Sequence, residues 1–295
     1  MIGAIVGDIV GSIYEWDNIK TKDFPLFQDD CFFTDDTVMT CAVAEAIMEG
    51  GKRDNFIDAM KKYGRMYPGA GYGGKFTSWL ISDTREPYNS FGNGSAMRVS
   101  PCGWITDCDC YDKTGKIPEE VADIAKLSSE VTHNHPEGIK GAMATADAIF
   151  LCRYYRKKDA NTLDDCKKAV KEHIEKKYGY NLSQTLDEIR PGYDFDVTCQ
   201  GSVPQAIIAF LESTDFEDAI RNAISIGGDS DTVAAITGSI AEAAYGIPDW
   251  IKEKALSYLD KPLMDIVNRW EKENAELKKR IKTFNKILKA DEVVN

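Results

Sequence analysis

The chain has 295 residues, of which 48 are Asp or Glu and 36 are Lys or Arg, so its formal net charge is −12. Affinity for a nucleic-acid backbone comes from clustered basic side chains, and this balance therefore argues against a DNA- or RNA-binding protein. The apolar runs fall short of the roughly 18 residues that a membrane span needs, so we expect no membrane contact.

Two features indicate a cytoplasmic protein. The first residues lack the basic stretch and the long apolar run of a signal peptide. The 8 cysteines are too sparse for the disulfide framework of a secreted domain.

The first segment, GAIVGDIVGSIYE at 3–15, mixes small, apolar and acidic residues. Gly7 and Gly11 are four residues apart and would share one face of a helix, where they permit close packing against a second helix. Asp8 and Glu15 are isolated carboxylates in an otherwise apolar segment, and carboxylates are rarely buried without partners. Glu15 is either an exposed side chain or, beside a metal, a general acid or base.

An acidic cluster, FTDDTVMT at 33–40, leads into a helix. Apolar side chains recur at three- and four-residue spacing from Val38 to Ile47, and Gly50 and Gly51 end the pattern. The same periodicity recurs along the chain, whereas alternating strand-like runs are short and few. The sequence therefore predicts an all-α protein, with further helices over 54–67, 119–131, 138–156, 162–178, 203–212, 216–226, 232–245 and 249–288.

Two glycine-rich stretches lie between these helices. Residues 68–74, PGAGYGG, form a loop that either closes over a ligand or simply connects two helices. Residues 90–98, SFGNGSAMR, match neither a Walker A motif nor the full dinucleotide fingerprint. Their small residues nonetheless expose backbone N–H groups before an expected helix start, an arrangement that suits phosphate.

Two of the 3 histidines stand in the segment THNHPEG at 132–138. An H-x-H pair in a loop is found more often in hydrogen bonds at the entry of a helix than in a metal site. We therefore expect His133 and His135 to contact a ligand or to make structural hydrogen bonds.

A second acidic cluster, GGDSDTV at 227–233, repeats the pattern of the first, since both end in Asp-Thr-Val and run into an apolar helix. Capping explains part of this pattern, because Thr and Asp side chains bind free N–H groups at a helix start. Capping needs one side chain per helix, however, whereas the clusters offer the carboxylates of Asp35, Asp36, Asp229 and Asp231. If the two helix starts face each other, the excess negative charge requires a cation, and oxygen ligands select Mg²⁺, Mn²⁺ or Ca²⁺.

No linker, low-complexity tract or repeat divides the chain, and we expect one domain over 1–295. Its C-terminal part, 249–295, reads as a charged amphipathic helical segment with a solvated face. A partner-binding role is the alternative for this segment.

In this order, the segments GDIVGSIYE, FTDDTVMT, GYGG, GNGSAMR, THNHPEG and GGDSDTVAAITG resemble those of the ADP-ribosylglycohydrolase family, which includes the dinitrogenase-reductase-activating glycohydrolases. The resemblance runs from residue 1 to residue 246. It implies a compact, single-domain orthogonal helical bundle with two divalent cations, Mg²⁺ or Mn²⁺, in a cleft that binds ADP-ribose.

The resemblance also implies roles for individual residues. Glu15 matches the family's acidic residue near the metals and would act in catalysis, with Asp36 as a second catalytic group. His133 would contact the ligand. The metal ligands would be Thr34, Asp35, Asp36, Asp229, Asp231 and Thr232, and the substrate would be held by Ser90, Phe91, Gly92, Asn93, Gly94, Ser95 and Met97 together with His133.

The implied function is a metal-dependent hydrolase that removes ADP-ribose from a modified acceptor by cleaving the N- or O-glycosidic bond at the anomeric carbon. The acceptor would be a protein side chain such as arginine, or a small conjugate, so an ADP-ribosylated protein is an expected partner. Two alternatives stay open: a two-metal phosphoesterase acting on ADP-ribose phosphate or a nucleotide, and a non-catalytic ADP-ribose-binding or crystallin-like protein. Every matching ligand position is filled, which argues against a loss of activity.

Overall fold

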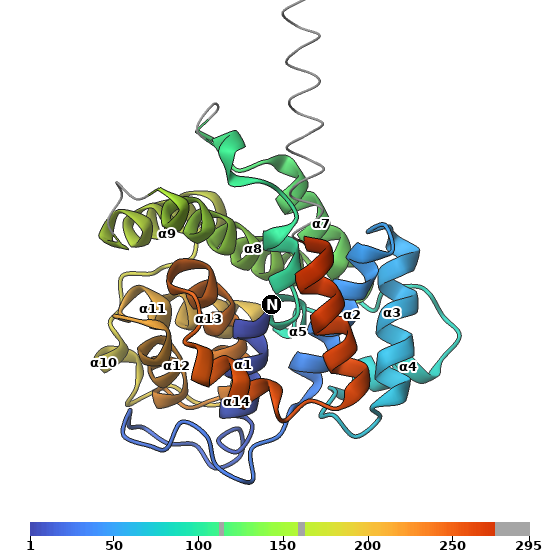
Figure 1. Cartoon of the computed structure of the whole chain (residues 1–295), viewed down its shortest axis with the longest axis horizontal. Coiled ribbons are helices and arrows are strands. Elements are labelled where there is room, and N and C mark those ends of the chain that lie inside the picture. Colours follow the sequence, from blue (N-terminus) through green and yellow to red (C-terminus); the bar gives the residue numbers. More distant parts are fainter. Residues whose placement is uncertain (112–114, 159–162, 275–295) are drawn as a thin grey trace, which may run out of the picture.

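The computed structural model describes residues 1–111, 115–158 and 163–274, and Figure 1 shows how the helices are arranged. Over these residues the prediction of an all-α protein is confirmed, because no β-strand forms and the one bridge between extended segments joins Gly92 to Thr198. The α-helices are α1 (Ile2–Gly11), α2 (Asp35–Met48), α3 (Arg53–Met66), α4 (Gly74–Ile81), α5 (Gly94–Met97), α7 (Glu119–Glu130), α8 (Pro136–Lys157), α9 (Leu163–Tyr178), α10 (Leu186–Ile189), α11 (Cys199–Leu211), α12 (Phe216–Ser225), α13 (Ser230–Tyr245) and α14 (Asp249–Leu256), with short 3-10 helices η1 (Ser100–Trp104) and η2 (Cys108–Cys110).

Two almost wholly buried helices, α1 and α13, lie side by side at the centre of the fold (Figure 1). Their backbones touch, because a Cβ atom added to Gly7 would overlap Ala234 and one added to Gly11 would overlap Asp231. The order of these contacts along the chain makes the two helices antiparallel. The close packing predicted from Gly7 and Gly11 is therefore confirmed, and it brings Asp8 beside the start of α13.

The other helices pack around this pair. The longest of the described helices, α8, contacts α13 as well as α7 and α9, and α11 and α12 also lie against α13. On another side, α2 packs against both α1 and α3. The C-terminal half of α1 and the N-terminal ends of α2 and α13 thus meet in one core, although they come from opposite ends of the sequence.

The C-terminal region differs from the predicted helix over 249–288. Helix α14 ends at Leu256, and a new helix occupies 261–274. Pro262 explains the break, because proline has no N–H group and fits only the first turn of a helix. Leu263 and Val267 of the new helix are fully buried in the core. The remainder of the predicted segment, 275–295, lies outside the described residues, and the assignment of 1–295 to one domain stays a prediction.

Among the described helices, none reaches the combination of length and apolar composition that spanning a membrane requires.

Candidate active site

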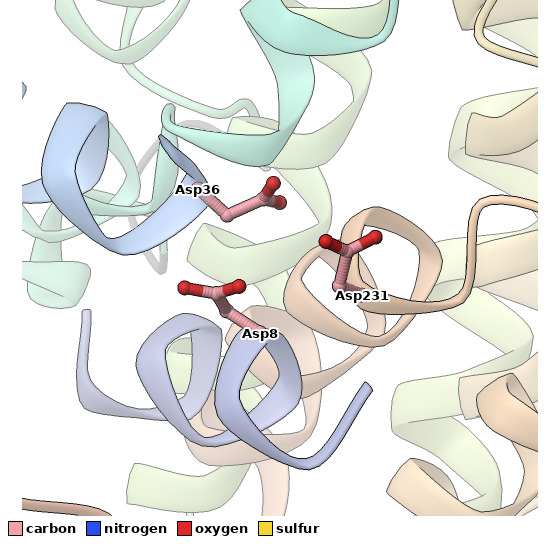
Figure 2. A group of neighbouring side chains, drawn as sticks. All are labelled: Asp8, Asp36 and Asp231. Carbon is pink, nitrogen blue, oxygen red and sulfur yellow. The ribbon is translucent and has the colours of Figure 1, made fainter. Parts of the chain in front are cut away.

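Three buried carboxylates from three helices converge on one point (Figure 2). They belong to Asp8 of α1, Asp36 of α2 and Asp231 of α13, and each contributes an oxygen atom that lies within 4.8 Å of the others. These residues are 0%, 1% and 3% exposed, respectively. The two acidic clusters of the sequence therefore face each other, and Asp8 joins them as a residue that the sequence analysis did not assign to the site.

Asp8 holds the start of α2 in place. Its Oδ1 accepts a hydrogen bond from the hydroxyl of Thr34 (2.6 Å), and its Oδ2 accepts from the backbone N–H groups of Thr34 (2.9 Å) and Thr37 (3.0 Å). A carboxylate is favoured there because the first turn of a helix has unpaired N–H groups and the positive end of the helix dipole. The sequence did carry a signal for Asp8, since a carboxylate inside the apolar run of α1 needs a partner.

A second group of carboxylates adjoins the first. Glu15, Asp229 and Asp231 also offer oxygen atoms within 4.8 Å of one another, and Asp231 belongs to both groups. The two groups are therefore continuous. No Lys, Arg or His of the described residues forms an ion pair with these carboxylates, and the charges that act on Asp36, Asp231 and Glu15 are those of neighbouring carboxylates.

The electrostatic consequence is a set of raised pKa values. Burial is the largest cause for Asp36 and Asp231, and the charges of neighbouring carboxylates add to it, so both pKa values lie well above the usual one. Burial and then the charge of Asp229 raise the pKa of Glu15 to about 7. Oδ1 of Asp36 has no hydrogen-bond partner among the described residues, while its Oδ2 accepts from the hydroxyl of Thr232 at 3.1 Å. The cluster thus lacks positive charge, and its oxygen atoms suit a divalent cation.

A cavity of about 520 Å³ opens beside the cluster. Its volume falls in the range of small-molecule pockets, roughly 300–1,000 Å³. Most of the residues predicted for the site line this cavity: Glu15, Asp35, Asp36, Ser90, Gly92, Asn93, Gly94, Met97, His133, Asp229, Asp231 and Thr232. Thr34, Phe91 and Ser95 do not, and Thr34 lies beneath the cavity with its hydroxyl directed at Asp8.

Phe91 and Ser95 point away from the cavity that the rest of their loop faces. Phe91 is 45% exposed and its ring packs against that of His135, with the centroids 5.3 Å apart. Ser95 is fully buried, and its hydroxyl donates to the carbonyl of Gly138 at 2.7 Å. Because the loop winds into the short helix α5, its successive side chains point in different directions, and a run of adjacent residues does not share one surface.

Asn93 lines the cavity, but its amide nitrogen is used within the protein. This nitrogen donates to Oδ2 of Asp229 at 2.7 Å and to the hydroxyl of Ser202 at 3.1 Å. The residue is 6% exposed. The hydrogen bond from Asn93 therefore orients the carboxylate of Asp229.

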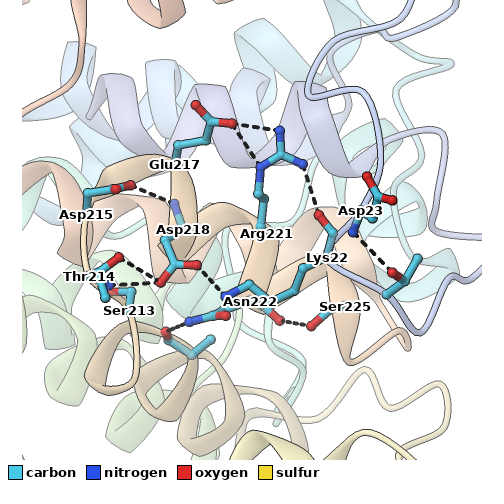
Figure 3. A network of polar contacts seen from close by, with 12 residues as sticks. Lys22, Asp23, Ser213, Thr214, Asp215, Glu217, Asp218, Arg221, Asn222 and Ser225 are labelled. Atoms are coloured by element: carbon cyan, nitrogen blue, oxygen red, sulfur yellow. Dashed lines mark hydrogen bonds and ion pairs between the residues drawn. The ribbon is translucent and has the colours of Figure 1, made fainter.

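The loop that carries Glu15 is fastened to α12 and to the turn that follows it. The amide nitrogen of Asn18 donates to the carbonyl of Gly228 (2.9 Å), and its Oδ1 accepts from the backbone N–H of Gly228 (2.7 Å). Further along the loop, Arg221 of α12 donates to the carbonyl of Lys22 at 3.0 Å (Figure 3). These contacts hold Glu15 close to the second acidic cluster.

Aromatic side chains that the sequence analysis did not identify complete the cavity wall. Trp16 and Phe195 stack with their ring centroids 5.2 Å apart, although they are 81% and 44% exposed. Tyr72, Phe76 and Tyr88 also line the cavity. Local periodicity gives no sign of the contact between Trp16 and Phe195, because these two residues are far apart in the sequence and meet only through the tertiary fold.

The chain is similar to several known proteins in sequence and fold. The profile of the family described as ADP-ribosylglycohydrolase matches residues 1–281. ADP-ribosylhydrolase ARH3 of Homo sapiens is 27% identical over 316 residues, covering 84% of each chain. ADP-ribosylarginine hydrolase Tri1 of Pseudomonas putida (strain GB-1) is 24% identical, over 91% of this chain and 77% of its own. A solved structure described as an ADP-ribosylglycohydrolase-related protein complex has the same fold, with a TM-score of 0.63 and 23% identity over 95% of this chain and 97% of its own.

Proposed function

Since the chain belongs to the ADP-ribosylglycohydrolase family and is thus an ADP-ribosyl hydrolase, we propose that it cleaves the N- or O-glycosidic bond at the anomeric carbon of ADP-ribose with two divalent cations. One observation carries this proposal. The two carboxylate groups that meet at Asp231 are continuous, form no ion pair with a Lys, Arg or His of the described residues, and adjoin one cavity.

The ligands proposed for the cations are all oxygen atoms. Thr34, Asp35, Asp36, Asp229, Asp231 and Thr232 are the set that the family resemblance implies. Asp8 lies close enough to Asp36 and Asp231 to join that set, or else orients Thr34. Carboxylate and hydroxyl oxygens suit Mg²⁺ and Mn²⁺. When bound, such ions neutralise the carboxylates and polarise oxygen atoms of the substrate and of water.

Glu15 is the proposed proton-transfer group. It borders the cavity, and a pKa of about 7 lets a carboxyl group both donate and accept a proton near neutral pH. Asp36, the alternative, is 1% exposed and is held by Thr232, so it is less able to reach a leaving group. Cleavage of a glycosidic bond passes through an oxocarbenium-like state, and Glu15 would assist its formation by transferring a proton at the bond that breaks.

The proposed acceptor is a protein side chain such as arginine, or a small ADP-ribose conjugate. The name of Tri1 specifies ADP-ribosylarginine. The exposed Trp16 and Phe195 rings beside Glu15 offer a stacking surface for a planar guanidinium group. An ADP-ribosylated protein is then the macromolecular partner.

A panel of substrates tests this function. Arginine-linked ADP-ribose, serine-linked ADP-ribose and ADP-ribose phosphate would each be incubated with Mg²⁺, with Mn²⁺ or with a chelator. We expect free ADP-ribose from a side-chain conjugate and no turnover with the chelator. Release of inorganic phosphate instead would identify a phosphoesterase, and binding of ADP-ribose without any product would identify a non-catalytic binder. Full turnover in the presence of the chelator would rule out the proposed metal centre.

A further inference from the structure

His133 lies between α7 and α8, and its two ring nitrogens have different surroundings. The residue is 5% exposed and borders the cavity beside the turn formed by Gly92 and Gly94. Nε2 lies 3.5 Å and 3.2 Å from the positions that a Cβ atom would occupy on Gly92 and Gly94. Over the part of the chain that the structure describes, no protein group forms a hydrogen bond with Nε2. The two glycines therefore leave this nitrogen accessible from the cavity.

The other ring nitrogen ends a buried chain of hydrogen bonds. Nδ1 of His133 lies 2.8 Å from the hydroxyl oxygen of Thr132, and the same oxygen accepts a hydrogen bond from Nη2 of Arg98 at 2.8 Å. Arg98 is 1% exposed and Thr132 is 0% exposed, so this chain of hydrogen bonds is buried. In the bond between Arg98 and Thr132, Arg98 must be the donor, because a guanidinium group only donates.

The bond from Arg98 determines where the hydroxyl proton of Thr132 goes. Within the described residues, Nδ1 of His133 is the available acceptor for that proton. If Nδ1 itself carried a proton, the buried hydroxyl proton of Thr132 would be left without an acceptor, which is unfavourable for a buried polar group. Nδ1 therefore accepts, and the proton of the neutral ring belongs on Nε2.

We infer that Arg98 and Thr132 are positioning residues that fix His133 in the tautomer with its proton on Nε2, so that the ring donates a hydrogen bond to a ligand in the cavity. Burial and the neighbouring guanidinium of Arg98 lower the pKa of His133 well below its usual value, which keeps the ring neutral. A neutral donor of this kind recognises an oxygen acceptor, such as a ribose hydroxyl or a phosphate oxygen of ADP-ribose. The identity of the ligand rests on the proposed function, whereas the tautomer rests on the hydrogen bonds alone.

The tautomer is measured directly by nitrogen-15 NMR of the histidine rings. With 3 histidines in the chain, His133 is assigned by the loss of its signals in His133→Gln. We expect the wild type to show the single tautomer with the proton on Nε2. Thr132→Val removes the hydroxyl and should lose that preference, and the affinity for ADP-ribose should fall about 10-fold, the value of one hydrogen bond. Thr132→Ser keeps the hydroxyl and should restore both.

Thr145→Val is the matched control, because Thr145 is also fully buried and its hydroxyl bonds to the carbonyl of Gly141. It should change neither the tautomer nor the affinity. A proton on Nδ1 in the wild type would overturn the inference even if Thr132→Val fails to fold. A changed tautomer with unchanged ADP-ribose affinity would overturn the role in ligand binding. If the wild type has the expected tautomer but binds no ADP-ribose, the proposed function fails while the assignment of the tautomer stands.

Discussion

The protein contains two kinds of buried carboxylate. One kind, represented by Asp147, is paired with a cationic side chain, and the other lies among further carboxylates beside the cavity. Asp147 of α8 is 0% exposed, like Asp8, but its Oδ2 accepts from Nε2 of His173 (2.8 Å), Nζ of Lys177 (2.8 Å) and the hydroxyl of Tyr178 (2.6 Å). Burial alone would raise the pKa of Asp147, yet these donors outweigh it and the pKa lies below its usual value. In the acidic cluster beside the cavity, burial and like charges act together and the pKa values rise.

The presence of a carboxylate oxygen without a hydrogen bond does not distinguish Asp147 from the acidic cluster around Asp36. Within the part of the chain that the structure describes, Oδ1 of Asp147 has no hydrogen-bond partner, and neither has Oδ1 of Asp36. The two sites differ in charge, because Asp147 is paired with Lys177 and the cluster around Asp36 has no cationic partner among the described residues. A carboxylate that ties two helices together has its donors within the fold, whereas a cluster built around a ligand needs positive charge from outside the chain.

The largest expected effect is on turnover. Asp36→Asn should lower the rate of ADP-ribose release by at least about 100-fold, since even groups that only orient metal ligands are worth 10- to 100-fold. Asp147→Asn, an equally conservative change at an equally buried carboxylate, should leave the rate within about 2-fold, because Asp147 does not line the cavity and its donors lie on α9. Equal rates for both variants would remove the distinction between the two sites.

In a measurement of stability, Asp147→Asn should have a larger effect than Asp36→Asn. Asp147→Asn should lower the free energy of unfolding by about 2 kcal/mol, because it removes the charge that three donors share. Asp36→Asn relieves repulsion and should not destabilise the metal-free protein. Urea unfolding in the presence of a chelator measures both values, and a loss of stability in Asp36→Asn as large as that in Asp147→Asn would contradict the comparison.

A smaller effect is expected where the cluster does have a donor. Asn93→Ala removes the amide that orients Asp229, and the affinity for Mg²⁺ or Mn²⁺ should fall about 10-fold, with turnover recovering at higher metal concentration. Ser202→Ala is the control, because it removes the other partner of Asn93 and leaves the bond to Asp229 in place. Titration of activity against metal concentration distinguishes the two variants.

The smallest effect is in the pH dependence of stability. A carboxyl group with a raised pKa binds more protons in the folded protein, so stability falls as the pH rises between the unfolded and folded pKa values. For Glu15, this window runs from its usual pKa of about 4 up to about 7, and for Asp36 and Asp231 it extends upward from about 4. The metal-free protein should therefore become more stable when the pH falls from about 7 to about 5.5, and Asp36→Asn, which lacks one of these groups, should gain less.

Asp147 should act in the opposite direction and at lower pH. Its lowered pKa stabilises the fold above the usual value of an aspartate, about 4, and that contribution is lost as the pH falls below it. Thermal unfolding of the wild type and of Asp147→Asn across the acid range measures this loss. If the two curves stayed parallel below about pH 4, the pairing of Asp147 would not contribute as described.

Local features of the sequence were sufficient for much of the fold. The helical periodicity from Val38 to Ile47 and the glycines that follow it predicted α2, which ends at Met48. The repeated Asp-Thr-Val pattern placed both acidic clusters at helix starts, and the structure has them there. These predictions hold because helix formation and capping depend on residues within one or two turns. Pro262 was also a local signal, and the break that it causes could have been predicted.

The tertiary structure decided which carboxylates meet. Asp8, Asp36 and Asp231 approach each other because α1 and α13 touch through their glycines and because Asp8 caps α2. The same packing directs the side chains of Phe91 and Ser95 away from the cavity and places the amide of Asn93 where it donates a hydrogen bond to Asp229. Such contacts join residues that are far apart in the chain, so no local period or propensity encodes them. The sequence by itself determined the helices and the chemical character of the site, and the packing of those helices determined its geometry.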